Sequence, residues 1–293
     1  MKTRTRWILI FLAPTVLVGI VLFFLPLLLL VSSSFFEYTQ LGGLDALGEF
    51  LALENYSRFM SDPRAGQAFP NTLVWLILQT TVHVALALLV AIVLRRLKRF
   101  RGFVRTAYAI PNMITLPALA LVIRMMMHPQ LGVVNRVIEM VTGEPFSLNW
   151  FGNLDTAFFA VSLTVVPWAG IAAILIMTDI ASIPNELYES AEVDGATEFQ
   201  KDRHITIPMV RNMVGTVTIL GVTSMMNDFG MIMVTTWGGP GYSTYNLPYM
   251  VYRMIWSDRN YGIANAGGTI ILVVGVLLVF AVQKIYRVGR ARD

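Results

Sequence analysis

The sequence predicts an all-α polytopic membrane protein with six transmembrane helices. The chain has 293 residues, of which 56% are hydrophobic and only 14% are charged, and its mean hydropathy is +0.64. Soluble domains carry about 25% charged residues, so this composition indicates an integral membrane protein. Six apolar segments account for most of the chain, and the longest polar, helix-forming stretch lies within the loop 179–208.

The six apolar segments are each close to the ~20 residues that a helix needs to cross about 30 Å of hydrocarbon. They cover residues 7–31, 72–94, 106–127, 157–178, 213–236 and 263–283. The first follows basic residues, as a secretory signal would, but its apolar run is too long and no clear small-residue cleavage site closes it. We therefore expect a retained span and a single transmembrane domain over 1–293.

The distribution of basic residues predicts the orientation of the chain in the membrane. Of the 22 Lys and Arg residues, sixteen lie in segments 2–6, 95–105, 201–211 and 284–292, and five lie in the other loops. Cytoplasmic loops carry the excess of Lys and Arg. Both termini and the loop 179–208 are therefore expected in the cytoplasm, and nothing in the net charge of +4 calls for nucleic acid.

The cytoplasmic loop has the pattern of a short helix, a glycine turn and a second short helix. This interpretation rests on three features: residues that can cap a helix, two apolar residues four apart on one helix face, and a glycine that can adopt a left-handed backbone. The residues in these roles are Ser182 and Pro184 at the first helix start, Leu187 and Ala191 on one face, Gly195 at the turn, Thr197 with Gln200 as a weak capping box, and Pro208 opening the next apolar helix.

The same loop resembles the conserved cytoplasmic motif of the inner-membrane permeases of ABC importers. That motif reads Glu-Ala-Ala, three residues, Gly, nine residues, Ile-x-Leu-Pro. The matching residues here are Glu189, Ser190, Ala191, Gly195, Ile205, Ile207 and Pro208, with Ser190 in place of an alanine and Ile207 in place of a leucine. An ordinary amphipathic linker between spans has no need for this spacing.

The resemblance implies the type I ABC importer permease fold in a prokaryotic cytoplasmic (inner) membrane. It implies two ATPase subunits that contact the loop, a second homologous permease forming a heterodimer, and an external solute-binding protein. ATP and Mg would be bound by the ATPase partners, and this chain would bind no cofactor. The implied coupling residues are Leu187, Glu189, Ser190, Ala191, Asp194, Gly195, Ile205 and Pro208.

A second resemblance narrows the family to carbohydrate uptake. The stretch Thr236–Pro240 is similar to the Thr-x-Gly-Gly-Pro signature of the larger permease in maltose and glycerol-phosphate importers. Phe229 fits the aromatic residue that precedes it, although Gly230 stands where an aspartate is common. Counted from Asn55 to Gly268, the resemblance covers most of the chain, and it implies that a sugar or related polyol is transported.

Four polar or aromatic residues at mid-membrane depth are the candidates for the substrate pathway: Trp168, Ser224, Asn227 and Asp228. A sugar needs an aromatic face and a few hydrogen-bond partners in an otherwise apolar pocket. An intramembrane Asp costs about 2.5–3.5 kcal/mol on insertion scales, so it is expected to face the bundle interior or water. The plainer alternatives are a packed core role for Trp168 and, for Asp228, a polar contact between helices with Asn112 or His83.

Several function classes lack the residues that they need. The chain has no cysteine, none of its four lysines follows a glycine as a P-loop lysine does, and the three histidines have no metal-ligand spacing. The sequence therefore predicts no catalytic residue and no metal site. The main alternative is a self-sufficient secondary carrier with Asp228 as a proton site and Arg124 or His83 nearby. A membrane-embedded hydrolase ranks third, because no catalytic constellation can be assembled.

Overall fold

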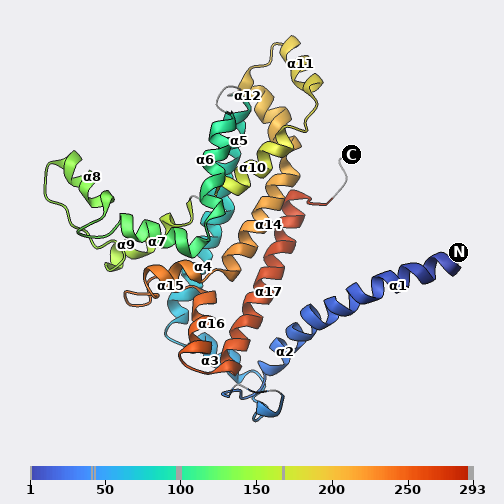
Figure 1. Cartoon of the computed structure of the whole chain (residues 1–293), viewed down its shortest axis with the longest axis vertical. Helices are drawn as coiled ribbons and strands as arrows, with labels where there is room; N and C mark the ends of the chain where they lie inside the picture. Colours follow the sequence, from blue (N-terminus) through green and yellow to red (C-terminus); the bar gives the residue numbers. More distant parts are fainter. Residues whose placement is uncertain (1, 41, 43, 97–100, 167–168, 290–293) are drawn as a thin grey trace. The chain divides into compact units, whose positions relative to one another are not determined.

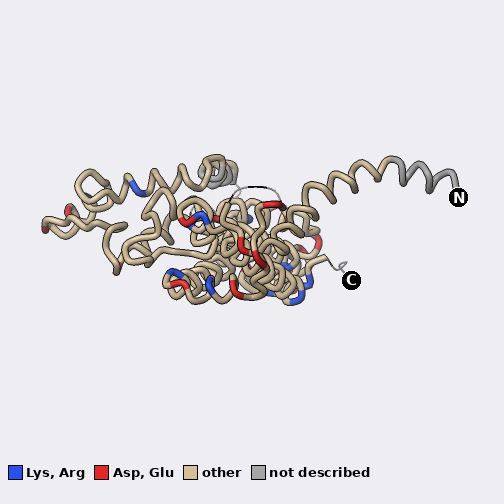
Figure 2. Tube along the Cα trace, turned by 90° about the horizontal axis from the view of Figure 1, so that it is seen from below, with Lys and Arg blue, Asp and Glu red and all other residues tan. Residues whose placement is uncertain are grey.

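The structure is a computed structural model that describes residues 2–40, 42, 44–96, 101–166 and 169–289. Helices make up most of these ranges, and the one β feature there is an isolated antiparallel bridge between Phe36 and Phe50. Figure 1 labels the helices in chain order. Little of the trace in Figure 2 carries charge, as the composition predicts.

The described chain divides into two compact units, and the first comprises residues 1–65 and 250–273. It contains α1 (Lys2–Gly19), η1 (Ile20–Phe24), α2 (Leu25–Ser33), η2 (Leu44–Ala46), α3 (Glu54–Ser61), most of α16 (Leu247–Trp256) and the first part of α17 (Tyr261–Tyr286). Two polar contacts hold its loops. The Asn55 amide donates to the carbonyl oxygens of Ser34 and Phe36 at 2.9 and 2.8 Å, and Arg64 pairs with Asp62 and Asp258, each at 2.7 Å.

The second unit comprises residues 66–249 and 274–293 and contains both candidate sites. Its helices, in chain order, are α4 (Ala65–Leu78), η3 (Gln79–His83), α5 (Val84–Arg96), α6 (Arg101–Ala109), η4 (Ile110–Met113), α7 (Leu116–Met126), α8 (Val133–Thr142), α9 (Leu154–Leu163), α10 (Ala169–Ile180), α11 (Asn185–Val193), α12 (Glu198–Lys201), η6 (Asp202–Thr206), α13 (Ile207–Met209), α14 (Arg211–Asn227), α15 (Gly230–Thr235) and the remainder of α16 and α17.

The core of the second unit lies between α5, α10 and α14. On α5 the buried positions recur every three or four residues, which places them on one helix face. Small residues such as Ala87, Ala91 and Ala173 let the helix backbones approach closely. The buried set is Val84, Ala87, Ala91, Leu94, Ala173, Ile176, Met177, Ile180, Ile183, Val210, Val214 and Val217.

Within the described ranges, three of the six predicted spans are continuous helices that are long and apolar enough to cross a membrane. These helices are Phe11–Ser33, Ala65–Arg96 and Tyr261–Tyr286, with mean hydropathies of 2.8, 2.3 and 2.4. They contain most of the predicted span 7–31 and all of 72–94 and 263–283. Two bent pairs, Ala169–Ile180 with Asn185–Val193 and Glu198–Met209 with Arg211–Asn227, would raise the number to five if each pair counted as one span. The six-span topology remains a prediction.

Each of the other three predicted segments is interrupted in the structure. Segment 106–127 is interrupted before α7, where Thr115 is extended and Pro117 occupies the first turn of the new helix. Segment 157–178 is divided between α9 and α10. Segment 213–236 breaks at Asp228, whose ψ of 118° is extended. A side chain that bonds nearby backbone N–H groups competes with helix, and Asp228 does so here.

Candidate functional site

The polar loop folds as the sequence predicts around Gly195. Helix α11 ends at Val193, and Gly195 follows with φ of +76°, in the left-handed region. The amide of Ala196 donates to the carbonyl of Ala191 at 2.9 Å and so closes the helix end. A Cβ at Gly195 would meet no atom within 4 Å, so the backbone conformation alone favours glycine there.

Both predicted helix starts in this loop can be checked. The capping box is confirmed: the amide of Gln200 donates to the Thr197 hydroxyl at 3.3 Å, and the amide of Thr197 donates to the Gln200 side chain at 2.7 Å. The expectation that Ser182 caps the first helix is wrong. Pro184 occupies the N-cap position, and the Ser182 hydroxyl donates instead to the carbonyl of Asp179 at 2.7 Å.

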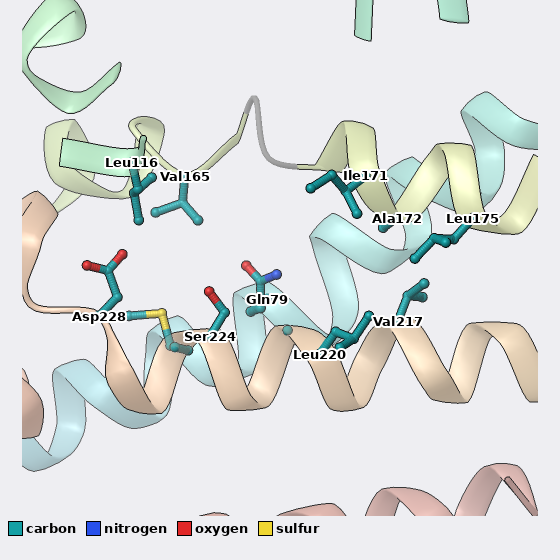
Figure 3. Close-up of a pocket in the computed structure, with 12 residues that line it drawn as sticks. Gln79, Leu116, Val165, Ile171, Ala172, Leu175, Val217, Leu220, Ser224 and Asp228 are labelled. Carbon is teal, nitrogen blue, oxygen red and sulfur yellow. The ribbon is translucent and has the colours of Figure 1, made fainter. Parts of the chain in front are cut away.

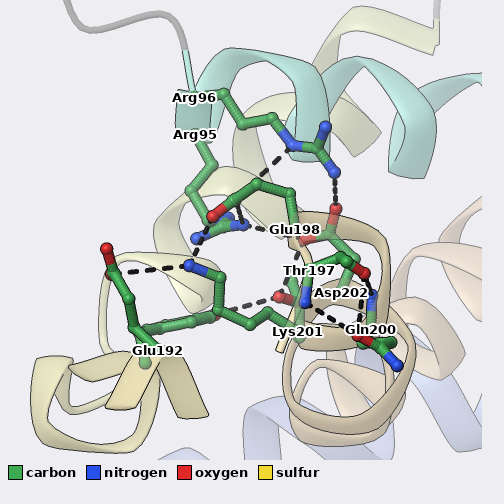
Figure 4. Close-up of polar contacts among 10 residues, drawn as sticks. Arg95, Arg96, Glu192, Thr197, Glu198, Gln200, Lys201 and Asp202 are labelled. Atoms are coloured by element: carbon green, nitrogen blue, oxygen red, sulfur yellow. Dashed lines mark hydrogen bonds and ion pairs between the residues drawn. The ribbon is translucent and has the colours of Figure 1, made fainter. Parts of the chain in front are cut away.

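Ion pairs attach the second loop helix to the end of α5, as Figure 4 shows. Arg95 donates to Asp202 and to Glu198, each at 3.0 Å. Arg96 pairs with the second carboxylate oxygen of Asp202. The Asp202 side chain is 7% exposed, and a buried carboxylate of this kind needs its cationic partners in place. Asp202 therefore ties η6 to the second apolar segment.

Tyr188 connects the first loop helix to the same cluster. The Arg95 guanidinium lies 4.6 Å from the centre of the Tyr188 ring, within the range of a cation–π contact. The Tyr188 hydroxyl is 3.0 Å from that of Thr206, which in turn donates to Asp202 at 3.2 Å. Helix α11, η6 and α5 consequently share one hydrogen-bonded cluster around Asp202.

Lys201 links the two loop helices to each other. It pairs with Glu198 one turn earlier, and its Nζ lies 3.6 Å from a Glu192 carboxylate oxygen on α11. The hydrogen bond from Lys201 holds the pKa of Glu198 below its ordinary value, and the same bond raises the pKa of Lys201. Each group stabilises the charged form of the other, so both are ionised at neutral pH.

The predicted coupling residues lie mostly on the open side of this loop. Glu189, Ser190, Asp194, Gly195 and Pro208 are exposed, and Leu187 is 43% exposed. The other two, Ala191 and Ile205, are half-buried.

Two further apolar side chains join this open side, Val193 and Phe199, which are 88% and 71% exposed. Neither was predicted from the sequence. A large apolar residue in an otherwise polar loop is the pattern that could have revealed them. The loop therefore exposes three large apolar side chains, Leu187, Val193 and Phe199, on a frame that is held internally by ion pairs.

A separate cavity of about 250 Å³ lies between α14, α10, α7 and η3, and Figure 3 shows its lining. Most of the wall is aliphatic. Three polar side chains, Gln79, Ser224 and Asp228, point into it. The lining residues are Gln79, Leu116, Val165, Ile171, Ala172, Leu175, Val217, Leu220, Gly221, Ser224, Met225 and Asp228.

One carboxylate oxygen of Asp228 caps a helix, and the other faces the cavity. Its Oδ1 accepts from the amides of Gly230 and Met231, at 2.9 and 3.4 Å, and so caps α15. Its carbonyl oxygen accepts from the Asn246 amide at 2.8 Å. The second carboxylate oxygen makes no hydrogen bond within the described part of the chain, which leaves it available on the cavity side.

The other predicted pathway residues are placed differently. Ser224 lines the cavity with Asp228, one helical turn away. Asn227 does not line it: its side chain is exposed and donates to the carbonyl of Thr223 at 2.7 Å. Trp168 lies outside the described residues. Gln79, which the sequence analysis missed, enters from η3, where the wider π-helical turn replaces α-helix, as often happens at functional sites.

Two segments far apart in the sequence meet at the loop that follows α15. The Asn71 amide, at the start of the second apolar segment, donates to the carbonyls of Ser243 and Tyr245 at 2.8 and 2.9 Å. Those residues follow the Thr236–Pro240 stretch, in which Gly238 has φ of +81° and a Cβ would fall 2.1 Å from the Tyr245 ring. Asn246 then joins this loop to the backbone of Asp228.

The contacts expected for a proton-driven carrier are not found among the described residues. Arg124 donates to the carbonyl of Val234 at 2.7 Å rather than to Asp228. The Nδ1 of His83 is buried without a partner, and His83 does not line the cavity. No group of three or more His, Asp or Glu side chains that could hold a metal is present in the described ranges.

Comparison with known proteins identifies the family. Residues 83–288 match the family described as "Binding-protein-dependent transport system inner membrane component". The sulfoquinovosyl glycerol transport system permease SmoG of Agrobacterium fabrum is 28% identical over 302 residues, covering 99% of this chain and 94% of that protein. The multiple sugar-binding transport system permease MsmF of Streptococcus mutans is 26% identical over 276 residues, covering 93% of each.

A solved structure shares the fold. It belongs to a bacterial ABC transporter involved in the import of the acidic polysaccharide alginate, and it matches with a TM-score of 0.82 at 21% identity over 97% of this chain and 96% of that one. This chain therefore belongs to the inner-membrane components of binding-protein-dependent transport systems: it is a permease subunit of an ABC importer, a transport component rather than an enzyme, and it has their helical fold.

Proposed function

We propose that this permease moves a sugar or related polyol that an external binding protein delivers, by alternating access driven by ATP. The cavity carries this proposal. Its aliphatic walls with three converging polar side chains match what a polyhydroxylated ring requires, and binding sites for small molecules have this composition. Its ~250 Å³ is just below the ~300–1,000 Å³ typical of ligand pockets, which suits a small ligand or a site that a second subunit completes.

The names of the relatives support the substrate class. SmoG and MsmF belong to transport systems for a sulfoquinovosyl glycerol and for multiple sugars. The Thr236–Pro240 stretch that resembles the carbohydrate permeases is joined through Asn246 to Asp228 at the cavity. We take Ser224 and Asp228, with Gln79, as the residues that contact substrate.

The loop 179–208 would couple this cavity to ATP hydrolysis. Two separate ATPase subunits, which bind ATP and Mg, would close on the exposed apolar side chains of Leu187, Val193 and Phe199. The ion pairs of Asp202 with Arg95 and Arg96 would make the loop and α5 move together as one rigid unit. Gly195 would set the angle between the two loop helices.

A second homologous permease would complete the translocation pathway as a heterodimer. The whole chain, 1–293, would act as one multi-pass permease domain in the cytoplasmic (inner) membrane, with both termini and the coupling loop in the cytoplasm. This orientation rests on the excess of Lys and Arg in the same segments.

Uptake by proteoliposomes tests the energy source. Vesicles would contain this chain with its partner permease and ATPases, the external binding protein on one side and ATP on the other, and a labelled sugar panel. We expect uptake that requires both ATP and binding protein, and none from a proton gradient. Gradient-driven uptake by this chain alone, without ATP, would establish the secondary carrier instead.

A further inference from the structure

The cavity contains one carboxyl group, and no described Lys or Arg side chain lines it. Asp228 is the one ionisable group among the residues that line it. Its Oδ1 accepts two backbone N–H groups, and its second oxygen stays on the cavity side. A ligand that enters this cavity therefore meets a carboxylate at one end of an aliphatic wall.

Three arginines on neighbouring helices are already engaged elsewhere. Arg124 on α7 donates to the carbonyl of Val234 at 2.7 Å, and Arg211 on α14 donates to the carbonyl of Ile285 at 2.5 Å. Arg95 at the end of α5 is paired with Asp202 and Glu198. Within the part of the chain that the structure describes, none of these three arginines lines the cavity.

Gln79 and Ser224 offer hydrogen bonds that the described residues do not use. The Ser224 hydroxyl is unlike those of Thr218 and Thr223 on the same helix, which donate to the carbonyl four residues earlier. The Gln79 amide can both donate and accept, and it borders Gly221: a Cβ at that glycine would lie 2.9 Å from the Gln79 Nε2. The absence of a side chain at position 221 thus leaves room for Gln79 at the cavity wall.

We propose that Asp228 is ionised in this cavity, so that the cavity selects an uncharged polyhydroxylated ring, or one carrying an amine, and rejects a ring that carries a carboxylate, while Gln79 contacts the ring whatever its charge. Vicinal hydroxyls can donate to the open oxygen of Asp228 and bond in either direction with Gln79 and Ser224. A uronate would place a second anion against Asp228 in a partly dry site. This inference rests on the proposed function, since it assumes that the ligand is a sugar-like molecule.

The fold match does not decide the charge of the ligand. The similar solved structure is of a transporter for an acidic polysaccharide, but at 21% identity it shows the fold alone. The charge preference must come from the side chains that line this cavity, and here they supply a carboxylate.

Three probes with the same ring separate charge from shape: glucose, glucosamine and glucuronate. Their binding would be measured by saturation-transfer NMR on the assembled permease–ATPase complex in detergent, in the absence of the binding protein, which could impose its own selectivity. We expect glucose and glucosamine to bind and glucuronate to bind roughly tenfold more weakly or not at all, because like charges a few ångströms apart repel strongly near a protein.

Two variants assign the effect to named residues. Asp228→Asn removes the charge but keeps an oxygen that can cap α15, so it should abolish most of the discrimination against glucuronate. Gln79→Leu should weaken binding of all three probes several-fold and leave their order unchanged. Asp155→Asn, at the start of α9 and outside the cavity, is the matched control and should change neither the affinity for the probes nor the discrimination against glucuronate. The melting temperature of each variant shows whether it is folded.

The outcomes distinguish this inference from the proposed function. Equal binding of glucose and glucuronate to the parent complex, or discrimination that persists in a folded Asp228→Asn variant, would overturn the inference. Absence of binding by any probe, in a complex that still takes up sugar with ATP and binding protein, would also overturn it while leaving the importer function intact. Failure of ATP-driven uptake itself would overturn the proposed function.

Discussion

The loop 179–208 and the cavity at Asp228 use polar groups in opposite ways. In the loop, Asp202 is nearly buried, and both of its oxygens are taken by arginines of α5. In the cavity, Asp228 uses one oxygen to cap α15 and leaves the other open. Both carboxylates belong to the same compact unit, and they differ in whether the chain satisfies them.

This difference teaches what each region can do. A buried carboxylate with both oxygens paired holds the elements around it in one arrangement, whereas a carboxylate with one open oxygen can accept a ligand. The loop therefore fits the role of a rigid coupling element, and the cavity fits that of a binding site. The variants below test whether the two roles can be separated.

Loss of the Asp202 side chain should have the largest effect. Asp202→Ala leaves Arg95 and Arg96 without their main anion and removes the acceptor of Thr206. Breaking a buried ion pair by removing one partner costs about 3–5 kcal/mol. We expect a large fall in melting temperature in detergent and loss of ATP-driven uptake. Glu192→Ala, whose side chain is 75% exposed, is the control and should change little. Equal stability in both variants would contradict the role assigned to Asp202.

A side chain at Gly195 should act through the backbone alone. Gly195→Val forces a β-branched residue into φ of +76°, with no clash within 4 Å, and such a conformation costs about 1–2 kcal/mol. Membrane insertion should survive, but ATPase association and uptake should fail.

The chain contains a matched control for that strain. Gly143, after α8, has φ of +73° and equally open space around its Cβ position, but it lies outside the coupling loop. Gly143→Val should cost similar stability and keep uptake. Gly195→Asn should be the milder change, because Asn tolerates the left-handed region. If Gly143→Val lost uptake as completely as Gly195→Val, strain rather than coupling would explain both.

Reducing the space at Gly221 should have a smaller effect, confined to the cavity. Gly221→Ala would place a Cβ 2.9 Å from the Nε2 and 3.0 Å from the Cγ of Gln79, so this flexible side chain must move. Overpacking costs about 1–3 kcal/mol, and a movable neighbour favours the low end of that range. We expect a several-fold rise in the KM for uptake with ATPase association unchanged. Gly66→Ala, with nothing within 4 Å, is the control.

The smallest expected effect concerns pH and the Lys201–Glu198 pair. The pKa of Glu198 lies below its ordinary 4.5, so its contribution to stability is present above that pH and is lost as the pH falls through the lowered pKa. The pKa of Lys201 lies above its ordinary 10.5, so its contribution is present below that pH and is lost at higher pH. The difference in melting temperature between the parent and Lys201→Met should be small and constant near neutral pH, and should shrink below pH 4.5.

The sequence predicts the local structure of the loop better than it predicts the membrane helices. The turn at Gly195 and the capping box at Thr197 depend on a few neighbouring residues, and both are confirmed. The break at Asp228 was missed because hydropathy averages over a window and does not register one side chain that captures the amides of Gly230 and Met231.

The partners of the site residues could not be predicted for a related reason. Arg95 and Asp202 are 107 residues apart, and nothing in their local sequence says that they meet. Gln79 lies in an apolar segment where a lone amide is easily assigned to packing. Asp228, Ser224 and Asn227 were all predicted because polar side chains within a membrane are costly and therefore tend to face a partner or a ligand. Asp228 and Ser224 do line the cavity, whereas Asn227 bonds the backbone of its own helix.

The measurement that tests the separation of the two roles most directly is the rate of ATP hydrolysis stimulated by the binding protein. It would be compared between Gly195→Val and Asp228→Asn in assembled, reconstituted complexes, with sugar uptake recorded in parallel. We expect Asp228→Asn to retain stimulated hydrolysis while its sugar selectivity or uptake changes, and Gly195→Val to lose both. Stimulated hydrolysis that survives in Gly195→Val, or disappears in a folded and assembled Asp228→Asn complex, would contradict this account.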